Sequence, residues 1–489
     1  MNHIKCTGLI LLAALLNSCS AGGPKDGFRA AEVVPTPEQV AYQQMEMVGF
    51  IHFTMNTFTD KEWGYGDEDP ALFDPAELDA EQWVLAAKAG GLKELILTAK
   101  HHDGFCLWPS AYTEHSVKNS PYKNGDGDIV REFTDACRKH GLKAGLYLSP
   151  WDRNHADYGQ PEYTTYYRNQ LRELLTRYGE INEIWFDGAN GGSGWYGGAD
   201  EERRIDRATY YDWDSTFALV KQLQPGVQIF SDAGPDLRWI GNEHGFAGET
   251  CWSTISTDQL VIGASDQGYL NTGDPEGDRW ITGQCDVSIR PGWFYHASED
   301  GRVKTPGELM DIYYKSVGRN GVLLLNLPPD RRGLIHETDA THLAALYGMV
   351  RQVFASDLAA GAEVKTERKH VVGRSYRPGN ITDADPETFW AAPANAEVKL
   401  VVALDEPRTF DHIVLQEPIR FGQRISAFRL EVPMEKGLWK EIARGTTIGY
   451  KRILQVDPVT TGEVRLVIEN ALYPPAISAL GLYHSGENH

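Results

Sequence analysis

Short apolar runs alternate with amphipathic segments between about residues 45 and 350. The runs are bulky and nearly continuous, which is typical of strands buried on both faces of a parallel sheet. They lie at Met47–Asn56, Leu92–Ala99, Leu142–Ser149, Asn182–Asp187 and Val227–Asp232. Helical patterns lie between them at Ala80–Ala89, Ile129–His140, Glu162–Tyr178 and about Thr209–Gln224, and the first three end beside a glycine, the expected C-cap. This rhythm predicts a TIM-like (β/α) barrel over residues 45–356.

The periodicity weakens after Asp232. We expect Trp293–His296 and Val322–Leu327 to be the last strands of the barrel, with one outer helix missing. From about residue 357 the chain shows short alternating strands at Val398–Leu404, His412–Gln416, Ser426–Val432 and Gly462–Glu469. No helical pattern is evident there, so residues 357–489 are predicted to form an antiparallel β-sandwich.

The N-terminus has the features of a targeting signal. Lys5 supplies a positive charge, Leu9 to Leu16 form a short apolar region, and Cys19 follows. Residues 1–19 resemble a bacterial lipoprotein signal, in which the cysteine is lipidated; an ordinary cleaved signal is the alternative. Both predict an exported protein, in the periplasm or on the outer membrane, whose only membrane contact is a lipid anchor. Residues 20–44 are predicted to be a tether.

Composition narrows the classes of partner. The net charge of −21 argues against a nucleic acid, because such binding depends on Lys and Arg neutralising phosphates. The 13 Trp and 22 Tyr suit a protein that handles sugars, and they also suit large cores. Four cysteines, at positions 106, 137, 251 and 285, have no metal-like spacing, so buried thiols are favoured over a disulfide.

Polar side chains follow four predicted barrel strands at the points where the strands end. They are His52, then His101 and His102, then Tyr147, and finally Trp185 and Asp187. A barrel brings such strand ends together around one pocket. Each group alone has an ordinary structural explanation, such as a helix-capping Asp, but together they predict a functional site.

Two chemistries could use these residues. A metal-dependent hydrolase could bind an ion through the histidines and Asp187, although the adjacent His101 and His102 would diverge on a regular strand. Alternatively, the histidines bind sugar hydroxyls, Trp185 stacks on the ring and Asp187 attacks the anomeric carbon, which requires a second carboxyl group. Glu243 and Glu249 are the candidates, because both lie in the segment that follows Val227–Asp232.

Seven stretches of the chain together resemble the α-L-fucosidases of glycoside hydrolase family 29. They are Gly49–Phe53, Asn56–Phe58, Glu62–Gly64, His101–Phe105, Leu146–Trp151, Trp185–Gly188 and Asn320–Asn326. The resemblance implies that Asp187 is the nucleophile of a retaining exo-fucosidase. It also implies a fucose pocket lined by His52, Glu62, Trp63, His101, His102, Tyr147 and Trp185, and it requires no metal or other cofactor.

The segment Gly234–Glu243 resembles the branch that acts on α-1,3- and α-1,4-linked fucose, in which the terminal Glu is the acid/base. This favours Glu243 over Glu249. Asp236, Arg238 and His244 are expected to bind a second sugar of a fucosylated oligosaccharide. The rival interpretations are the metal-dependent hydrolase and a fucose-binding protein without catalysis.

The C-terminal segment resembles discoidin-like, galactose-binding-type modules in Asn380–Asp385, Phe389-Trp390 and the closing Ile477–Tyr483. All the reacting groups lie before residue 350, so this module is predicted to be accessory. Asp383 and Asp385 could hold a structural calcium; a turn with capped Asp side chains is the alternative.

Overall fold

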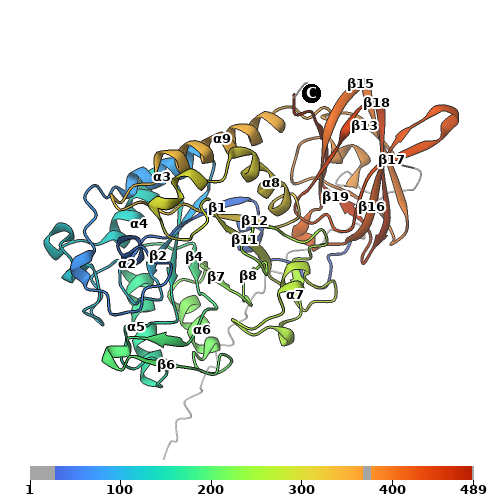
Figure 1. The fold of residues 1–489 in the computed structure, drawn as a ribbon. Helices are drawn as coiled ribbons and strands as arrows, with labels where there is room; N and C mark the ends of the chain where they lie inside the picture. Colours follow the sequence, from blue (N-terminus) through green and yellow to red (C-terminus); the bar gives the residue numbers. More distant parts are fainter. Residues whose placement is uncertain (1–27, 367–375, 487–489) are drawn as a thin grey trace, which may run out of the picture.

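The computed structural model describes residues 28–366 and 376–486 (Figure 1). Its first part is a closed barrel of parallel strands in the order β1-β12-β11-β8-β7-β4-β3-β2. The strands are β1 (Met47–Ile51), β2 (Glu94–Lys100), β3 (Lys143–Leu148), β4 (Glu183–Trp185), β7 (Gln228–Ser231), β8 (Leu237–Trp239), β11 (Thr282–Ser288) and β12 (Val322–Asn326). The predicted TIM-like barrel is therefore confirmed.

Helices cover the outside of the barrel, as Figure 1 shows. The longer ones are α3 (Ala80–Ala89), α4 (Ile129–His140), α5 (Glu162–Arg177), α6 (Trp213–Leu223), α8 (Pro306–Ser316) and α9 (Glu337–Val353). Shorter helices are α1 (Pro37–Gln43), α2 (Met55–Thr59) and α7 (Gln267–Thr272). Two small antiparallel sheets pair β5 (Gly192–Gly194) with β6 (Glu201–Arg203) and β9 (Thr254–Ile255) with β10 (Arg279–Trp280). The predicted missing helix is confirmed, because a short loop without a helix joins β7 to its parallel neighbour β8.

One predicted barrel strand was wrong. Trp293–His296 lies in a loop. The strand at this place in the barrel is β11, which begins eleven residues before Trp293, at Thr282. Every residue of β11 is buried, yet its sequence is Thr-Gly-Gln-Cys-Asp-Val-Ser. Strand β11 has no apolar run because several of its inward-facing side chains are polar.

The second part is an antiparallel β domain, as predicted. Its main sheet has the order β13-β15-β18-β16-β17, with β20 paired to β15, and β14 pairs with β19 separately. The strands are β13 (Glu363–Thr366), β14 (Trp390–Ala391), β15 (Val398–Gln416), β16 (Ile425–Pro433), β17 (Trp439–Gly445), β18 (Arg452–Ala471), β19 (Ala476–Ile477) and β20 (Ala479–Tyr483). Strand β15 contains two of the predicted strands, and two shifts of register against β18 lie between them.

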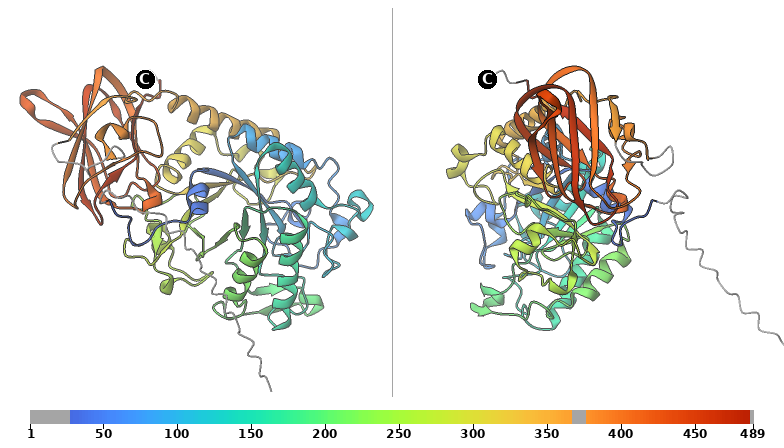
Figure 2. Two further views of the ribbon diagram at one scale, coloured as in Figure 1. Left: turned by 180° about the vertical axis from the view of Figure 1, so that it is seen from behind. Right: turned by 90° about the vertical axis from the view of Figure 1, so that its right-hand side faces the viewer.

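The segment before the barrel contacts the β domain. Phe28 packs against Phe389 and Phe421, with ring centroids 5.0 and 5.4 Å away, and Ala31 N donates a hydrogen bond to Phe421 O. The dark blue segment runs along the β domain in Figure 2. Helix α1 then begins with a capping box at Thr36. The predicted tether is therefore wrong from residue 28 onward, whereas the signal over residues 1–19 lies outside the described residues.

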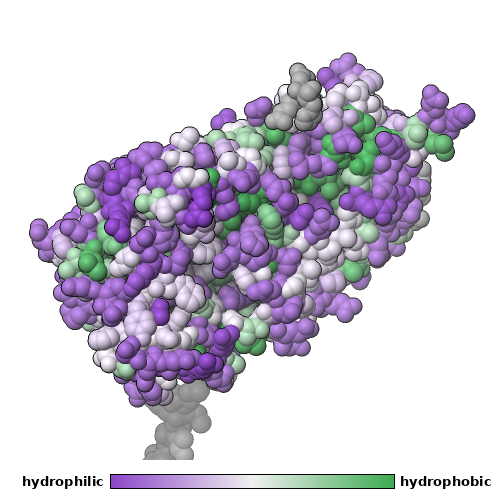
Figure 3. Space-filling model, in the orientation of Figure 1, coloured by the Kyte–Doolittle hydropathy of each residue, from purple (hydrophilic) through white to green (hydrophobic). Residues whose placement is uncertain are grey.

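Four further observations complete the fold. All four predicted thiols, Cys106, Cys137, Cys251 and Cys285, are buried and free. The helices of residues 28–366 and 376–486 are each too short or too polar to cross a bilayer. Figure 3 shows mostly hydrophilic residues on this face, with only small hydrophobic patches between them.

Asp383 and Asp385 form a capped turn of the β domain. Asp383 Oδ1 accepts from Asp385 N at 3.0 Å, and Asp385 Oδ1 accepts from Glu387 N at 2.9 Å.

Candidate active site

A cavity of ≈ 190 Å³ lies among the predicted site residues at the C-terminal ends of the barrel strands. Its lining contains Phe50, His52, Glu62, Trp63, His101, His102, Trp185, Asp187, Ala189, Glu243, Asp286 and Trp293. His52 follows β1, His101 and His102 follow β2, and Asp187 follows β4. The parallel barrel therefore gathers these groups as the sequence predicted.

Asp187 is held by two hydrogen-bond donors. Tyr147 Oη donates to Oδ2 at 3.0 Å, and Ala189 N donates to Oδ1 at 2.7 Å. Burial raises the pKa of the Asp187 carboxyl, and these two hydrogen bonds oppose that rise because they favour the ionised form. His102 Nε2 lies 3.9 Å from Oδ2. The carboxylate is thus oriented toward the cavity by fixed neighbours.

The three histidines are neutral. Burial lowers the pKa of His52 and of His102 to about 3, and it lowers the pKa of His101 well below its usual value. A neutral imidazole has one donor nitrogen and one acceptor nitrogen, so the partner of each Nδ1 decides what Nε2 offers to the cavity.

His52 and His102 both carry their proton on Nδ1. His52 Nδ1 lies 2.8 Å from Asn326 Oδ1, which can only accept. His102 Nδ1 lies 2.7 Å from Ser149 Oγ, whose own proton goes to Trp151 O. In both rings Nε2 is therefore an acceptor, which suits the hydroxyl groups of a sugar.

His101 has the opposite tautomer. Asn56 Nδ2 donates to Glu62 O at 3.2 Å and lies 3.3 Å from His101 Nδ1. Because an amide NH₂ group can only donate, His101 Nδ1 accepts and its Nε2 carries the proton. The cavity is thus lined by two imidazole acceptors and one imidazole donor.

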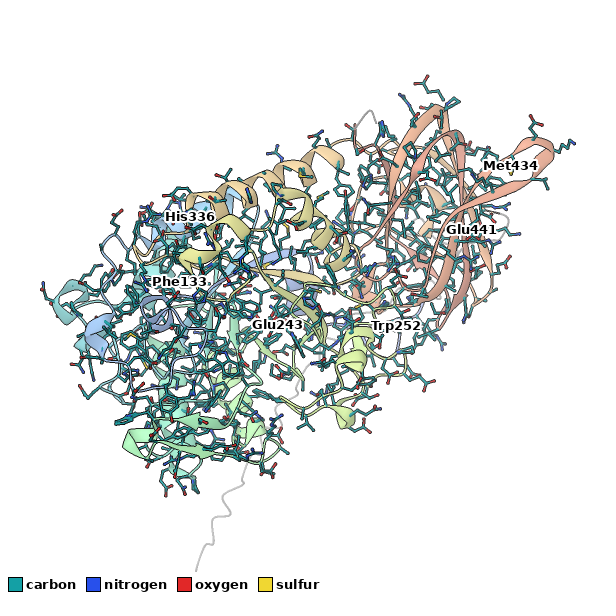
Figure 4. The ribbon with its side chains drawn as sticks, viewed as in Figure 1. Phe133, Glu243, Trp252, His336, Met434 and Glu441 are labelled. Atoms are coloured by element: carbon teal, nitrogen blue, oxygen red, sulfur yellow. The ribbon has the colours of Figure 1, made fainter. Side chains whose placement is uncertain are left out.

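Glu243 lies in the turn that follows β8, near the centre of the barrel in Figure 4. Trp293 Nε1 donates to its Oε2 at 3.3 Å. Burial raises the pKa of Glu243, the Trp293 hydrogen bond opposes the rise, and the charge of Asp187 adds to it. A carboxyl group in this setting keeps its proton to higher pH than a free Glu, as a general acid requires.

Glu249, the alternative acid, does not line the cavity. Its carboxylate is exposed and pairs with Arg319 at 3.2 Å, close to the β domain. The geometry therefore favours Glu243 as the partner of Asp187.

Glu62 and Trp63 form one rim of the cavity. The Glu62 carboxylate accepts from Trp293 N at 2.9 Å and lies 2.7 Å from His296 Nε2, so it joins its own loop to the loop that follows β11. The ring of Trp63 is 53% exposed and stands edge-to-face against His102. Trp63 therefore offers a free apolar surface at the entrance.

Trp185 lines the cavity in a different way from the one expected. Its ring stacks on Phe230 at a centroid distance of 4.1 Å and on Tyr147 at 5.3 Å, and these residues belong to the two neighbouring strands. Its faces are thus occupied, so the ring contributes an edge rather than a stacking surface. Its Nε1 donates to Gln284 Oε1 at 2.7 Å.

Asp236 and Arg238, which were expected to bind a second sugar, lie away from the cavity. Asp236 accepts from Ile229 N at 2.9 Å and pairs with Lys221 at 2.6 Å, beside the start of β8. Arg238 is completely buried and donates to the backbone oxygens of Leu270, Trp252 and Ile281. Both side chains stabilise the segment around β8, which corrects the expectation of sugar contacts.

Four lining residues were not predicted: Phe50, Ala189, Asp286 and Trp293. Phe50 belongs to an apolar strand, and Ala189 contributes mainly its backbone N–H to Asp187. Asp286 lies on the polar strand that the apolar pattern missed. A Trp in the loop after β11 could have been singled out only by knowing where that strand ends.

Two more cavities meet the first one at Glu243. One, of ≈ 270 Å³, extends past Asp187 and Asp286 to Asn190, Arg207, Asp232 and Gly263. The other, of ≈ 470 Å³, extends past His244 and Phe246 to Lys304, Glu308 and Asp311. Space is thus available on two sides of this carboxyl group, beyond the pocket that holds Asp187.

Comparisons with known proteins agree with this geometry. The model of the alpha-L-fucosidase family matches residues 35–349, and that of the F5/8 type C domain matches residues 364–479. A putative alpha-L-fucosidase 1 of Oryza sativa is 46% identical over 468 residues, which are 93% of this chain and 87% of that protein. Alpha-L-fucosidase 1 of Arabidopsis thaliana is 44% identical over 455 residues, covering 92% and 87%.

Solved structures show the same similarity. A putative alpha-L-fucosidase from Bacteroides thetaiotaomicron has a TM-score of 0.86 and 40% identity, covering 94% of this chain and 99% of that one. A Ruminococcus gnavus GH29 fucosidase in complex with fucose has a TM-score of 0.85 and 34% identity, covering 94% and 96%. With the barrel and its carboxyl-lined pocket, these matches show that the chain belongs to the α-L-fucosidases of glycoside hydrolase family 29.

Proposed function

We propose that this α-L-fucosidase releases α-1,3- or α-1,4-linked L-fucose from branched, Lewis-type glycans, with retention of configuration. The observation that carries the proposal is the position of Glu243, where the Asp187 pocket meets two further cavities. A sugar that carries fucose and a second substituent on neighbouring hydroxyls has two arms beyond the scissile bond. The two outer cavities offer one place for each arm.

Asp187 is the proposed nucleophile. It attacks the anomeric carbon while Glu243 donates its proton to the departing oxygen, and a covalent fucosyl-enzyme forms. Water then attacks the anomeric carbon while Glu243 removes its proton, so that a new C–O bond forms as the bond to Asp187 breaks and fucose is released. The two donors on Asp187 hold the attacking carboxylate, and the desolvation that raises the pKa of Glu243 favours the protonated form that the first step requires.

The remaining pocket residues are proposed to bind the fucose. The acceptors on His52 and His102 and the donor on His101 complement sugar hydroxyls, each of which can donate and accept. Trp63 offers the apolar surface that suits the C6 methyl group, which distinguishes fucose from galactose. The fucose complex of the Ruminococcus gnavus enzyme supports this assignment by similarity.

Export to the periplasm or outer membrane, with Cys19 lipidated, is part of the proposal and rests on the sequence of residues 1–19. Cell fractionation with a Cys19→Ala variant tests it. Loss of membrane attachment is expected, and unchanged attachment would refute lipidation.

Kinetics with defined glycans test the linkage. The kcat/KM for Lewis trisaccharides should exceed that for an α-1,2-linked fucoside by more than about tenfold, because the outer cavities contribute binding only to a branched leaving group. Comparable values for the two substrates would refute the proposed linkage.

Two variants test the chemistry. Asp187→Ala should lose turnover, and added azide should restore it with a β-configured fucosyl azide as product. Glu243→Gln should lose most activity on glycans and less on aryl fucosides with good leaving groups, which need the proton least. Substantial activity in the azide-free Asp187→Ala variant, or the Glu243 signature appearing instead in Glu249→Gln, would contradict these assignments.

A further inference from the structure

The carboxyl group of Asp286 lines the pocket together with those of Glu62, Asp187 and Glu243. It belongs to β11, where Gln284 reaches Trp185 and Ser288 reaches Asn326, so this inward-facing row of alternate residues supports the pocket. Asp286 also lines the cavity of ≈ 270 Å³ that leads away from Glu243. It therefore stands where the proposed fucose pocket opens toward the leaving sugar.

No cation balances this carboxyl group among the described residues. Its one partner from another residue is Trp239, whose Nε1 donates to Oδ1 at 2.8 Å. The residues that line the first cavity include neither lysine nor arginine. In the adjoining cavity the guanidinium of Arg207 donates to the backbone oxygen of Gly263.

Its neighbours make an ionised Asp286 costly. Burial raises the pKa of Asp286 well above the usual value, the Trp239 hydrogen bond opposes the rise, and a negative charge on Glu243 or Asp232 raises the pKa further whenever either group is ionised. Several carboxyl groups that share one poorly solvated space cannot all be charged. A protonated carboxyl group has one O–H donor in addition to its acceptors.

We propose that Asp286 is a specificity-determining residue which, as a neutral acid, donates a hydrogen bond to a hydroxyl group of the leaving sugar. The Trp239 N–H binds Oδ1, and Asp286 lines both the pocket and the adjoining cavity, where a hydroxyl group of the leaving sugar is proposed to meet the carboxyl group. This proposal rests on the proposed function, because it assumes a sugar leaving group beside Glu243. Asp187 and Glu243 carry out the bond exchange, whereas Asp286 recognises what departs.

Two variants separate this role from its alternatives. Asp286→Asn keeps a neutral donor and acceptor of the same shape, and Asp286→Ala removes both. For Asp286→Ala, kcat/KM should fall on the order of 10- to 100-fold more for a Lewis trisaccharide than for an aryl fucoside, which lacks those hydroxyls. Asp286→Asn should retain most of the trisaccharide activity. Equal losses of Asp286→Ala on both substrates, or a loss in Asp286→Asn as large as that in Asp286→Ala, would overturn the proposal.

Deoxygenated substrates test the contact directly. If Asp286 had a purely structural role, its replacement would not change how much kcat/KM falls when one substrate hydroxyl group is removed. The wild-type enzyme and Asp286→Asn should both lose kcat/KM when one particular hydroxyl is removed from the leaving N-acetylglucosamine or galactose. The Asp286→Ala enzyme, or Asp286→Ser if that variant folds better, should be insensitive to removal of the same hydroxyl. A deoxy series in which the variant and the wild type lose equally at every position would refute the contact.

The same experiment separates the two proposals. If the wild type hydrolyses α-1,2-linked fucosides as well as Lewis trisaccharides, the proposed linkage fails. The deoxy series is then run on the preferred leaving sugar, where it still confirms or refutes the Asp286 contact.

Discussion

The hydroxyl group of Tyr147 donates a hydrogen bond of 3.0 Å to Oδ2 of Asp187. Tyr147 lies on β3 and is paired in register with Trp185 on β4, two residues before the proposed nucleophile. This contact and the backbone N–H of Ala189 are the hydrogen bonds that hold down the pKa of Asp187 against burial. Tyr147 thus connects the barrel framework to the ionisation of the reacting group.

Tyr147→Phe should move the acidic limb of the pH–kcat/KM profile to higher pH. The variant lacks one of the two donors, so the pKa of Asp187 rises and the carboxylate is protonated at pH values where the wild type is still ionised. The sign follows because the nucleophile must be ionised: activity is lost as the pH falls through the pKa of Asp187. A shift on the order of one pH unit is expected for the loss of one such hydrogen bond.

Tyr163→Phe is the matched control. Its hydroxyl donates to Pro150 O at 2.7 Å within the fold, so the acidic limb should keep its position. If Tyr147→Phe leaves the limb in place, or if both variants move it equally, the Tyr147 hydroxyl does not control the ionisation of Asp187.

Buried Glu94 should make the protein less stable at alkaline pH. Its side chain is completely buried inside the barrel, it accepts from Asn182 Nδ2 at 2.7 Å, and burial raises its pKa to about 8. Between the ordinary pKa of Glu, about 4.3, and this raised value the folded state binds more protons than the unfolded state. The stability contributed by the protonated group is therefore lost as the pH rises through that window.

Glu94→Gln removes this titration. The difference in Tm between Glu94→Gln and the wild type should be more positive at pH 8.5 than at pH 5. The change should correspond to a free energy of unfolding on the order of 1–4 kcal/mol. Differential scanning calorimetry at the two pH values measures this, with Glu180→Gln on the surface as the control. A Tm difference that is the same at both pH values would mean that Glu94 does not change its protonation in that window.

Helices were predicted best where capping and periodicity agree. The bounds of α3 and α4 match the sequence prediction, because Asp79 and Asp128 cap their N-termini and a glycine ends each helix. Local chemistry fixes both ends in these two helices. The apolar strands were found for a similar reason, since buried parallel strands leave an almost continuous run of bulky residues.

The misses share another cause. Strand β11 has polar residues such as Gln284 and Asp286 that are buried because they serve the interior of the barrel, and such burial depends on contacts with distant strands. Arg238 was predicted to bind a sugar, yet its guanidinium group donates hydrogen bonds to backbone oxygens of three other segments. Neither fact can be read from neighbouring residues, whereas strand-end groups such as Asp187 can.

Chelators should leave the fucosidase activity unchanged. The proposed reaction takes its nucleophile from Asp187 and its proton from Glu243, and the Nδ1 atoms of the three pocket histidines already have partners. Assays before and after dialysis against EDTA measure kcat/KM. A loss that zinc or another divalent ion restores would favour the metal-dependent hydrolase.

The same samples test the calcium expectation for the β domain. The Asp383 and Asp385 carboxylates accept hydrogen bonds within their own turn, so the Tm should be the same with EDTA and with added calcium. A Tm that increases with calcium and returns to its chelated value in Asp383→Asn would establish a structural ion there.

Gln423 of the β domain should stabilise the protein without taking part in catalysis. Its Nε2 donates to Cys251 O at 3.0 Å, and its Oε1 accepts from Ser253 N at 3.0 Å and from Asn320 Nδ2 at 3.3 Å. These contacts join the two domains at a buried position, and two of the partners, Cys251 and Ser253, lie within ten residues of Glu243 in the sequence. Gln423→Ala leaves the buried N–H of Ser253 without its partner, which costs about 1–3 kcal/mol, whereas Cys251 O and Asn320 Nδ2 still bind each other.

The Tm of Gln423→Ala should therefore fall by several degrees, while kcat/KM for an aryl fucoside at 25 °C stays near the wild-type value. Gln455→Ala, on an exposed part of β18, is the control for the same substitution and should change neither quantity. Chains ending near residue 355 should unfold more readily still, because the segment from Glu249 to Ser253 loses its partners in the β domain. If Gln423→Ala is folded at 25 °C and nevertheless loses aryl fucoside activity, the β domain shapes the active site and is more than an accessory module.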